Sequence, residues 1–461
     1  MGASTEQIAE KTIPTADELI QDKLREIRLR LEGDAGLETA DIQHFRRPVE
    51  HPFTLEQRDS TTVLFGGLTW RHERLVEGAL SSLGYNAKAV PTPDVKAFQL
   101  GKEYGNNAQC NPTYFTVGNL VQYLQDLEEQ GLSRQKIIDD YVFMTAGACG
   151  PCRFGLYEAE YRLALRNSGF DGFRVLLFGL EGGLDQSETQ YEPGLEMNLD
   201  FFLALLNALM IGDELFQLGY QIRPYETNEG DTDRVMKESV EYLHDELRNR
   251  KKVELNGALK KWLTDTKFEG PMNYLVKFLN QLNGKDIMEA LHGVQSRFGD
   301  IEVDPFRVKP IVKIVGEFWA HTTEGDGNFN MFPFLEAEGA EVHVDRTVGT
   351  RIMYMLHQHK AWAKVKKAVH KGGTEQPFWR PDKRLAHTVK RNMTTGILTL
   401  AEGIYKRETN RVREALGATL HKSPDQYELE ELAKPFYNWR AGAGESHMEV
   451  GENIYYHTNH L

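Results

Sequence analysis

The residues in this sequence that are best suited to metal chemistry are its three cysteines, Cys110, Cys149 and Cys152. Cys149 and Cys152 form a Cys-Gly-Pro-Cys motif, and their spacing places both thiols on one side of a turn, so both can bind one metal centre. An odd number of cysteines, two of them close in sequence, is more typical of metal or redox chemistry than of a disulfide framework. We therefore predict that the three thiolates bind one metal centre, and an iron–sulfur cluster is the centre that this pattern favours.

Both cysteine segments fall where the sequence predicts the start of a helix. Cys110 stands two residues before Pro112, and proline is tolerated in a first helical turn because its missing N–H would be unpaired there. The segment that begins at Cys149 follows an apolar run over 140–145, which we interpret as a strand, and precedes a helical pattern. The unpaired N–H groups and the positive end of a helix stabilise a thiolate. Room for a cluster close to the backbone is provided by the glycines of this segment, Gly147, Gly150 and Gly155.

Three other interpretations of the cysteines stay open at this point. A thioredoxin-like dithiol needs only the Cys149–Cys152 pair, but the expected neighbouring tryptophan is missing and Cys110 is left without a role. A structural zinc site of three cysteines and one histidine is conceivable because the chain has 15 histidines, although zinc sites favour short knuckles over glycine-rich strand ends. The cysteines could also be buried and inert in an α/β core. A cluster usually has four thiolates, so one iron would need water, a hydroxyl, a substrate oxygen or a further cysteine.

The elements that must position these residues follow an α/β pattern. Short apolar runs alternate with helical periods of ten to fifteen residues, which indicates βαβ units and a parallel, doubly wound sheet. A second unit repeats the order strand, glycine, loop, helix, glycine and strand over 310–344, with strands at 310–316 and 341–344 and a helix at 328–338. In the first unit we predict strands at 62–66, 86–90, 140–145 and 173–178, and helices at 71–83, 113–130 and 153–167.

These patterns divide the chain into five segments. The predicted fold class is α/β, with two or more Rossmann-like, doubly wound parallel-sheet domains and helical insertions. The C-terminal segment either ends in a helix or belongs to a longer polypeptide, and both interpretations stay open. The segments are an acidic helical extension at 1–57, an α/β domain with the cysteines at 58–194, a helical region at 195–304, a second α/β domain at 305–375 and a helical part at 376–461.

Charge and hydropathy argue against several classes of protein. The 54 basic and 68 acidic residues give a net charge of −14, whereas a nucleic-acid-binding protein usually presents a basic face. No apolar run reaches the roughly 18 residues of a membrane span. The N-terminal stretch has no apolar region of the kind that a signal peptide needs. We therefore expect a cytoplasmic protein that binds neither nucleic acid nor a membrane.

The cysteine motifs resemble those of one known family. The run Ala148-Cys-Gly-Pro-Cys-Arg-Phe-Gly-Leu-Tyr157, with Cys110-Asn-Pro and Thr116-Val-Gly-Asn-Leu120 before it, resembles the 2-hydroxyacyl-CoA dehydratase component family. The resemblance extends over 60–461 and is closest to the dehydratase-like half of the large fused CoA-enzyme activases, which are related to double-cubane-cluster proteins. It implies Rossmann-like α/β domains that hold a [4Fe-4S] or linked double cluster, with Cys110, Cys149 and Cys152 as the ligands carried over.

The same resemblance implies a function. Family members receive low-potential electrons from an ATP-dependent iron–sulfur activator protein, and use them for radical dehydration or reduction of a small or CoA-linked substrate. This chain has neither a Gly-x-x-x-x-Gly-Lys-Ser/Thr loop nor an Asp-x-Gly-Ser/Thr signature, so we do not expect it to bind ATP itself. Fused relatives also continue with a further cysteine beyond the region that matches 457–461. The alternatives are a non-catalytic, cluster-carrying electron-relay or regulatory subunit and a zinc-stabilised binding protein, and each is compatible with a homo- or hetero-oligomer.

Several other residues lie near these motifs. Arg153 follows Cys152 and would either offset cluster charge or lie on the surface of a helix. Glu317 follows the predicted strand of the second unit, where a general acid or base is conceivable, although a helix cap is the simpler interpretation. We interpret Tyr157 and Phe154 as packing that keeps water from the metal centre. Positions beside glycine-rich loops that carry no specific signal are His321, His447 and the Gly66-Gly67 pair.

Overall fold

The computed structural model of the chain describes residues 16–34, 50–147, 153–179, 183–184, 192–251, 269–345, 347–371, 379–417, 421, 423–437 and 445–459. The chain divides into two compact units, Met1–Val49 and Glu50–Leu461. The first unit contains α1 (Ala16–Asp34), as its helical spacing predicted. All other elements belong to the second unit.

The second unit contains a five-stranded sheet with the strand order β2-β1-β3-β4-β5. Its strands are β1 (Thr62–Phe65), β2 (Asn86–Ala89), β3 (Tyr141–Ala146), β4 (Arg174–Gly179) and β5 (Gly183–Leu184). The first four run parallel and β5 pairs antiparallel with β4. The chain passes from β1 to β2 on one side and later to β3 on the other, which makes the β1/β3 boundary a topological switch point. In open α/β sheets, ligands bind outside the carboxyl ends of the strands at such a point.

One face of the sheet is covered by helices from two parts of the chain. Val63 of β1 and Val142 of β3 belong to this core, because alternate side chains of a strand point to the same face. The helices that cover it are α2 (Trp70–Ser82), α7 (Leu199–Ile222) and α8 (Asp231–Arg248). The helical region therefore contributes directly to the first α/β core.

The opposite face carries the helices that follow the cysteines. Leu64 and Phe143 point to this side and share a core with α4 (Asn111–Glu129) and α6 (Tyr157–Asn167). The short helix α5 (Arg134–Asp140) connects α4 to β3. Both sheet faces are thus buried, as in a sheet of parallel strands with helices on each side.

A close helix crossing fixes the segment before Cys110. The helix α3 (Val95–Tyr104) packs against α4 through two glycines. A Cβ atom on Gly118 would lie 1.7 Å from the carbonyl oxygen of Ala97, and one on Gly101 would lie 1.9 Å from that of Tyr114. Only glycine permits this approach at either position, so the two helices hold the intervening loop in one place.

A second, smaller parallel sheet contains β6 (Ile311–Lys313) and β7 (Glu341–His343). The helices α12 (Phe318–Thr322) and α13 (Met331–Ala337) lie between these strands in the chain, and α14 (Thr347–Lys371) follows β7. Phe332, Val342 and Val344 form a core here with Phe216 and Tyr220 of α7. The predicted order of strand, helix and strand is confirmed, although β6 is shorter than the predicted 310–316.

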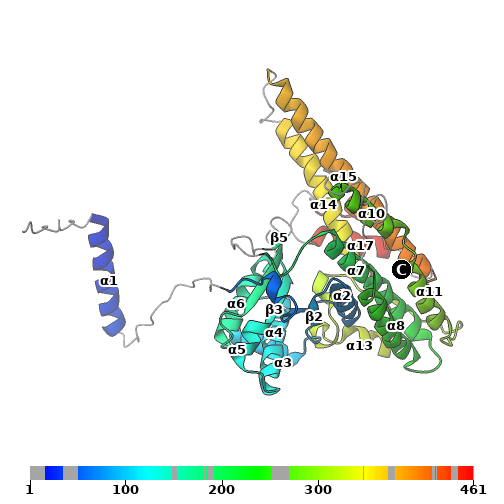
Figure 1. Ribbon diagram of the computed structural model, residues 1–461, viewed down its shortest axis with the longest axis horizontal. Coiled ribbons are helices and arrows are strands. Elements are labelled where there is room, and N and C mark those ends of the chain that lie inside the picture. The colour runs from blue at the N-terminus through cyan, green and yellow to red at the C-terminus, as the bar shows by residue number, and fades with distance from the viewer. Residues whose placement is uncertain are drawn as a thin grey trace, which may run out of the picture. The chain divides into compact units, whose positions relative to one another are not determined.

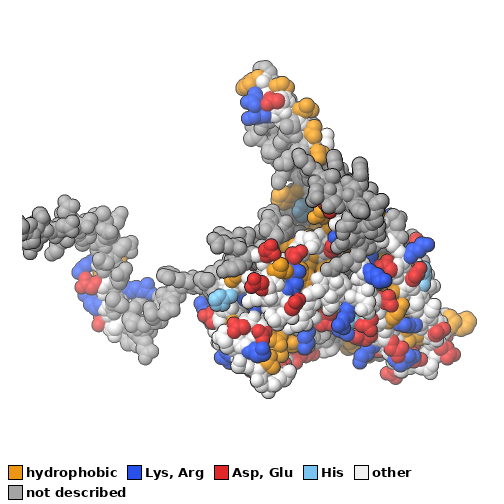
Figure 2. Space-filling model, viewed as in Figure 1, with side chains coloured by type: hydrophobic (Ala, Val, Ile, Leu, Met, Phe, Trp, Pro, Cys, Tyr) orange, Lys and Arg blue, Asp and Glu red, His pale blue; other side chains and the backbone are white. Residues whose placement is uncertain are grey.

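The remaining described elements are helical. The long helices α14 and α15 (Pro381–Ala415) lie side by side as an extended hairpin (Figure 1). Hydrophobic side chains are exposed along this hairpin (Figure 2), among them Leu385, Met393 and Ile397. No helix among the described residues has the length and apolar character needed to cross a membrane. The other elements are α10 (Glu269–Asn283), α11 (Asp286–Gly299), α16 (Gln426–Ala433), α17 (Ser446–Thr458), η1 (Leu55–Gln57), η2 (Arg153–Leu156), η3 (Arg223–Tyr225) and η4 (Gly325–Asn328).

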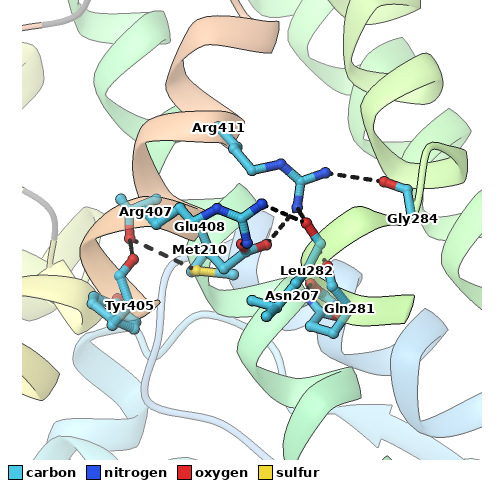
Figure 3. A network of polar contacts seen from close by, with 10 residues as sticks. Asn207, Met210, Gln281, Leu282, Gly284, Tyr405, Arg407, Glu408 and Arg411 are labelled. Atoms are coloured by element: carbon cyan, nitrogen blue, oxygen red, sulfur yellow. Dashed lines mark hydrogen bonds and ion pairs between the residues drawn. The ribbon is translucent and has the colours of Figure 1, made fainter. Parts of the chain in front are cut away.

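A polar network connects α15 to the turn between α10 and α11 (Figure 3). The guanidinium of Arg411 donates to the carbonyl oxygens of Leu282 at 2.8 Å and Gly284 at 3.0 Å. Its Nη1 atom also lies 2.8 Å from Oε2 of Glu408. These bonds satisfy carbonyl groups at the C-terminal end of α10 that have no partner within the helix. The hairpin of α14 and α15 is thereby bound to the helical region.

The coarse fold prediction is confirmed: the protein is a mixed α/β structure with a four-stranded parallel sheet. The strands and helices predicted for the first α/β domain, at 58–194, agree with the observed ones to within a few residues. The helix predicted at 153–167 begins as the 3-10 turn η2 and becomes α-helical at Tyr157. The helix α3 had no counterpart in the prediction. The five predicted segments of the chain stay a prediction.

Candidate functional site

Cys110 occupies the N-cap position of α4, as the sequence predicted. Its backbone is extended and its carbonyl oxygen accepts the first helical bond, from the N–H of Thr113 at 3.1 Å. Pro112 stands in the first turn, where a missing N–H costs nothing. The Cys110 side chain makes no capping bond and is half-buried. Its sulfur is therefore available to another partner, close to the positive end of the helix.

Two hydroxyl groups lie against the sulfur of Cys110. The Oγ1 atom of the buried Thr113 is 3.0 Å from Sγ, and the hydroxyl oxygen of Tyr157 is 3.6 Å away. Burial raises the pKa of Tyr157 above its ordinary value, and the neighbouring Cys110 raises it further. The phenol consequently keeps its proton at neutral pH and can donate it to a sulfur atom. A thiolate with two such donors is the environment that tunes metal-bound sulfur.

A buried carboxylate, Glu160 of α6, holds the loop that leads to Cys110. It is only 5% exposed. Its oxygens accept bonds from the backbone N–H of Asn106 at 3.1 Å, from Nδ2 of Asn106 at 2.7 Å and from Nε2 of Gln109 at 3.0 Å. The hydroxyl of Tyr114 in turn accepts from the N–H of Gln109 at 3.0 Å. The loop before Cys110 and the helix after Cys152 therefore form one framework.

Tyr161, one turn after Tyr157, connects α6 to the neighbouring elements. Its hydroxyl bonds to Thr116 of α4 and Thr145 of β3. Burial raises the pKa of Tyr161 to about 12, so the phenol stays neutral. The side chain thus fixes α6 against both the cysteine-bearing helix and the end of the central strand.

The other two predicted ligands, Cys149 and Cys152, lie outside the residues that the structure describes. The described chain on one side ends with β3 and Gly147, at the carboxyl edge of the sheet next to the switch point. A Cβ atom on Gly147 would lie 2.7 Å from Cδ1 of Leu177, so this glycine accommodates the adjacent strand. On the other side the described chain resumes at Arg153, four positions before Tyr157, whose hydroxyl contacts Cys110.

A cleft of about 530 Å³ adjoins the start of α4. This volume is in the range of small-molecule sites, which span about 300–1,000 Å³. Asn111 and Pro112, the residues directly after Cys110, form one part of its lining. The rest of the lining comes from the second α/β unit and includes aromatic side chains, among them the exposed Phe329 and Phe334. The remaining lining residues are Glu317, Trp319, Ala320, Gly327, Asn328 and Met331.

Glu317 lines this cleft and also caps α12, which confirms the capping interpretation. Its Oε2 atom accepts the N–H of Trp319 at 2.9 Å. Partial burial raises the pKa of Glu317, and the nearby carboxylates of Glu445 and Glu449 raise it further. A carboxyl group with a raised pKa at the wall of a cleft is a candidate for proton transfer.

The other residues singled out from the sequence have different surroundings. His321 is buried beside a second cavity, and burial lowers its pKa to about 4. Near Gly66 and Gly67, the N–H of Leu68 donates to Oε1 of Glu73 at 3.1 Å, so a carboxyl group already occupies this glycine turn. The side chains of Arg153, Phe154 and His447 lie outside the described residues.

Sequence reasoning missed Glu160, Thr113 and the cleft. A glutamate three positions after Tyr157, on a helix face with apolar neighbours, was the only sequence signal that Glu160 would be buried and would bind the loop before Cys110.

Among the described residues no group of three or more histidine, cysteine, aspartate or glutamate side chains is arranged to hold a metal ion. Comparison of the chain with protein-family models, with curated proteins and with solved structures gave no match.

Proposed function

We propose that this protein is an iron–sulfur protein of the 2-hydroxyacyl-CoA dehydratase type, in which Cys110, Cys149 and Cys152 bind a [4Fe-4S] or linked double cluster. The observation that carries the proposal is the contact between Cys110 and Tyr157, 3.6 Å from sulfur to oxygen. Tyr157 begins the helix that follows Cys149 and Cys152 in the chain, so the contact joins Cys110 to the helix after the second cysteine segment.

The surroundings of Cys110 fit a cluster ligand. Its sulfur caps no helical N–H and is near two hydroxyl donors. Hydrogen bonds to cluster sulfurs are one way in which a protein sets the reduction potential. In this proposal Thr113 and Tyr157 donate to the thiolate, Tyr157 also excludes water, and Glu160 keeps the loop before Cys110 in place. When bound, the cluster would supply one electron at a time at low potential.

The cleft beside Asn111 supports a substrate-binding role over a purely electron-carrying one. It is large enough for part of a small or CoA-linked substrate, and its aromatic wall suits an acyl group. Glu317, whose pKa is raised by burial, lies at this wall. We propose further that both α/β units are Rossmann-like and that a separate ATP-dependent iron–sulfur activator supplies the electrons.

The test is anaerobic purification followed by analysis of iron, sulfide and zinc. The proposal requires a brown protein with iron and sulfide in similar amounts, and an EPR signal after reduction. The Cys110→Ser and Cys149→Ser variants should each lose most of the iron, whereas Thr54→Ser, a conservative exchange at another N-cap, should keep it. A colourless protein loaded with zinc would show that the site is structural. Unchanged iron in both cysteine variants would show that the ligands are wrong.

Turnover separates the enzyme from its main alternative. Protein that has been reduced by the activator, or by a low-potential chemical reductant, is incubated with a panel of 2-hydroxyacyl-CoA thioesters. Consumption of a thioester supports the dehydratase proposal. Reduction and reoxidation of the cluster without consumption of any thioester would indicate an electron-relay subunit.

A further inference from the structure

A second cavity lies at the carboxyl edge of the small sheet, on the other side of α12 from the cleft. Asp345, which follows β7, lines it together with His321 of α12 and Arg351 of α14. The C-terminal helix α17 closes it with Glu452, and Glu445 at the start of α17 also contributes. This cavity contains no cysteine and plays no part in the proposed cluster site.

Buried polar atoms without partners converge on this cavity. Glu452 is only 1% exposed and His321 only 7%. The Oε2 atom of Glu452, the Nε2 atom of His321 and the Oγ1 atom of Thr350 have no hydrogen-bond partner. An ionised carboxylate in such a place would cost several kcal/mol, whereas a protonated carboxyl is neutral and far less costly to bury.

The face of α17 that packs on this region is polar. Glu445, Glu449, Glu452 and Tyr456 recur at helical spacing, so they share one side of the helix. The hydroxyl of Tyr456 donates to the carboxylate of Asp345, with oxygen–oxygen distances of 3.0 and 3.1 Å. Glu445 pairs with Arg351 at 2.6 Å. The helix also packs through Met448, which shares a small core with Tyr354 and Leu429, and through Gly451 against α16. The charges on the polar face therefore act on a helix that apolar contacts also hold.

The charges around Glu452 are mainly negative. Among the neighbouring carboxylates, Asp345 repels a charged Glu452 most strongly. Glu445 and Glu449, next to Glu452 on the C-terminal helix, add to this repulsion. Lys313 of β6 acts on it with the opposite sign, but its ammonium group already pairs with Asp345 at 2.6 Å. The remaining described groups that face the cavity are Arg351, which pairs with Glu445, and the neutral His321.

We propose that α17 is a proton-controlled latch: protonated Glu452 allows the helix to pack beside Asp345, and loss of that proton favours release of the helix. The inference does not depend on the iron–sulfur proposal, because it rests on the second α/β unit alone.

The latch is connected to the wall of the cleft. Oε2 of Glu445 accepts the backbone N–H of Phe318 at 2.8 Å, in the first turn of α12. The neighbouring residues Glu317, Trp319 and Ala320 line the cleft. Release of α17 removes this bond from α12, so the state of Glu452 also controls the order of the cleft wall.

The direction of the pH effect follows from linkage. Burial and the negative charge of Asp345 raise the pKa of Glu452 from 4.5 to about 8. Between these two values the packed helix keeps a proton that the released helix loses. Release therefore becomes easier as pH rises through this window, by at most about tenfold per pH unit for one proton. Above the upper value the effect of Glu452 levels off.

Hydrogen exchange followed by mass spectrometry on the full chain tests the latch. Peptides covering 445–459 and 316–323 are measured between pH 4.5 and pH 8, after correction for the intrinsic pH dependence of exchange. We expect protection of both segments to fall severalfold per pH unit above about pH 6.5, where the opposing effect of the buried His321 has levelled off. In Glu452→Gln, which cannot ionise, this slope should be lost while protection at low pH is retained. The control Glu431→Gln changes an exposed carboxylate on the adjacent α16 and should keep the wild-type slope.

Three results would overturn the proposal. The first is a wild-type protein whose α17 is protected equally across the pH range. The second is a Glu452→Gln variant that keeps the wild-type slope. The third is failure of both Glu452→Gln and Glu452→Leu to fold, because a group that only holds a proton can be replaced by a neutral side chain of similar size. If Glu452→Gln abolishes the pH dependence of protection in 445–459 but leaves that of 316–323 unchanged, the connection to the cleft wall is overturned.

Discussion

The hydroxyl oxygen of Tyr157 lies 3.6 Å from the sulfur of Cys110, although 47 residues separate them in the chain. Two independent sets of contacts produce this closeness. Glu160 binds the loop before Cys110, and Tyr161 binds both α4 and β3. The position of Cys110 relative to the helix that follows Cys152 is therefore fixed by buried polar groups, which is the arrangement that a shared metal centre needs.

The first prediction concerns the hydroxyl of Tyr157. Tyr157→Phe removes one donor from the Cys110 sulfur and leaves the aromatic packing intact. We expect the free energy of unfolding to fall by no more than about 1 kcal/mol. The midpoint potential of the bound cluster should become more negative, because the thiolate charge is less well compensated. EPR-monitored redox titration measures this shift. Tyr274→Phe, at an exposed tyrosine of α10, serves as the control, and an equal potential in both variants would contradict the proposed donor role.

The second prediction concerns the anchor of the Cys110 loop. Glu160→Ala removes the buried acceptor of three hydrogen bonds from Asn106 and Gln109. We expect a loss of about 2–3 kcal/mol in the free energy of unfolding, measured with urea. Iron content should fall as well, because the loop no longer presents Cys110 in one position. Glu129→Ala, at the exposed end of α4, should change stability by less than about 0.5 kcal/mol. Equal losses in the two variants would show that Glu160 is no anchor.

The third prediction concerns a buried aspartate between the two α/β units. Asp213 of α7 accepts the N–H groups of Val348 at 3.1 Å and Gly349 at 2.6 Å, at the start of α14. Its Oδ1 atom is also 3.1 Å from Nε2 of His72 in α2. Asp213→Ala should cost at least about 3 kcal/mol, because buried donors on two helices lose their acceptor together. Thermal and urea unfolding measure the loss, with the exposed Asp171→Ala as the control. A cost below about 1 kcal/mol would mean that water replaces the carboxylate.

The strands and most helices could be predicted because local patterns specify them. The run at 62–66 is apolar on both faces, and it forms the buried β1 between two layers of helices. Pro112 and the residues around it predicted the start of α4, which the structure has at Asn111. By contrast, α3 was not predicted, and it packs on α4 through a close crossing at Gly101 and Gly118. A contact of this kind has no signature in the sequence of either helix.

The candidate site could be predicted only in part, for a related reason. The cysteines and their position at helix starts follow from residue type and spacing. Glu160 and Thr113 act through partners that are distant in sequence or through a side-chain orientation that only the folded chain sets. The cleft is formed by the start of α4 and by Phe329 and Phe334 from the second α/β unit, so it exists only after the two have packed together.

The last prediction is a pH dependence of global stability that is due to Glu73. This carboxyl group is 5% exposed, and burial raises its pKa from 4.5 to about 8. The folded protein therefore keeps a proton that the unfolded chain releases above its ordinary pKa. The contribution of Glu73 to stability must fall as pH rises from 4.5 to 8, with a ceiling of about 5 kcal/mol for this one group.

Glu73→Gln tests this dependence, because the amide oxygen can still accept the N–H of Leu68 and the side chain cannot ionise. We expect the variant to be more stable than the wild type at pH 8 by about 2–4 kcal/mol, and equally stable near pH 4.5. Urea unfolding at a series of pH values measures the difference. Glu56→Gln, at an exposed carboxylate, should follow the wild type. A Glu73→Gln variant that is less stable than the wild type at pH 8 would show that the carboxyl group is ionised and paired in the folded protein.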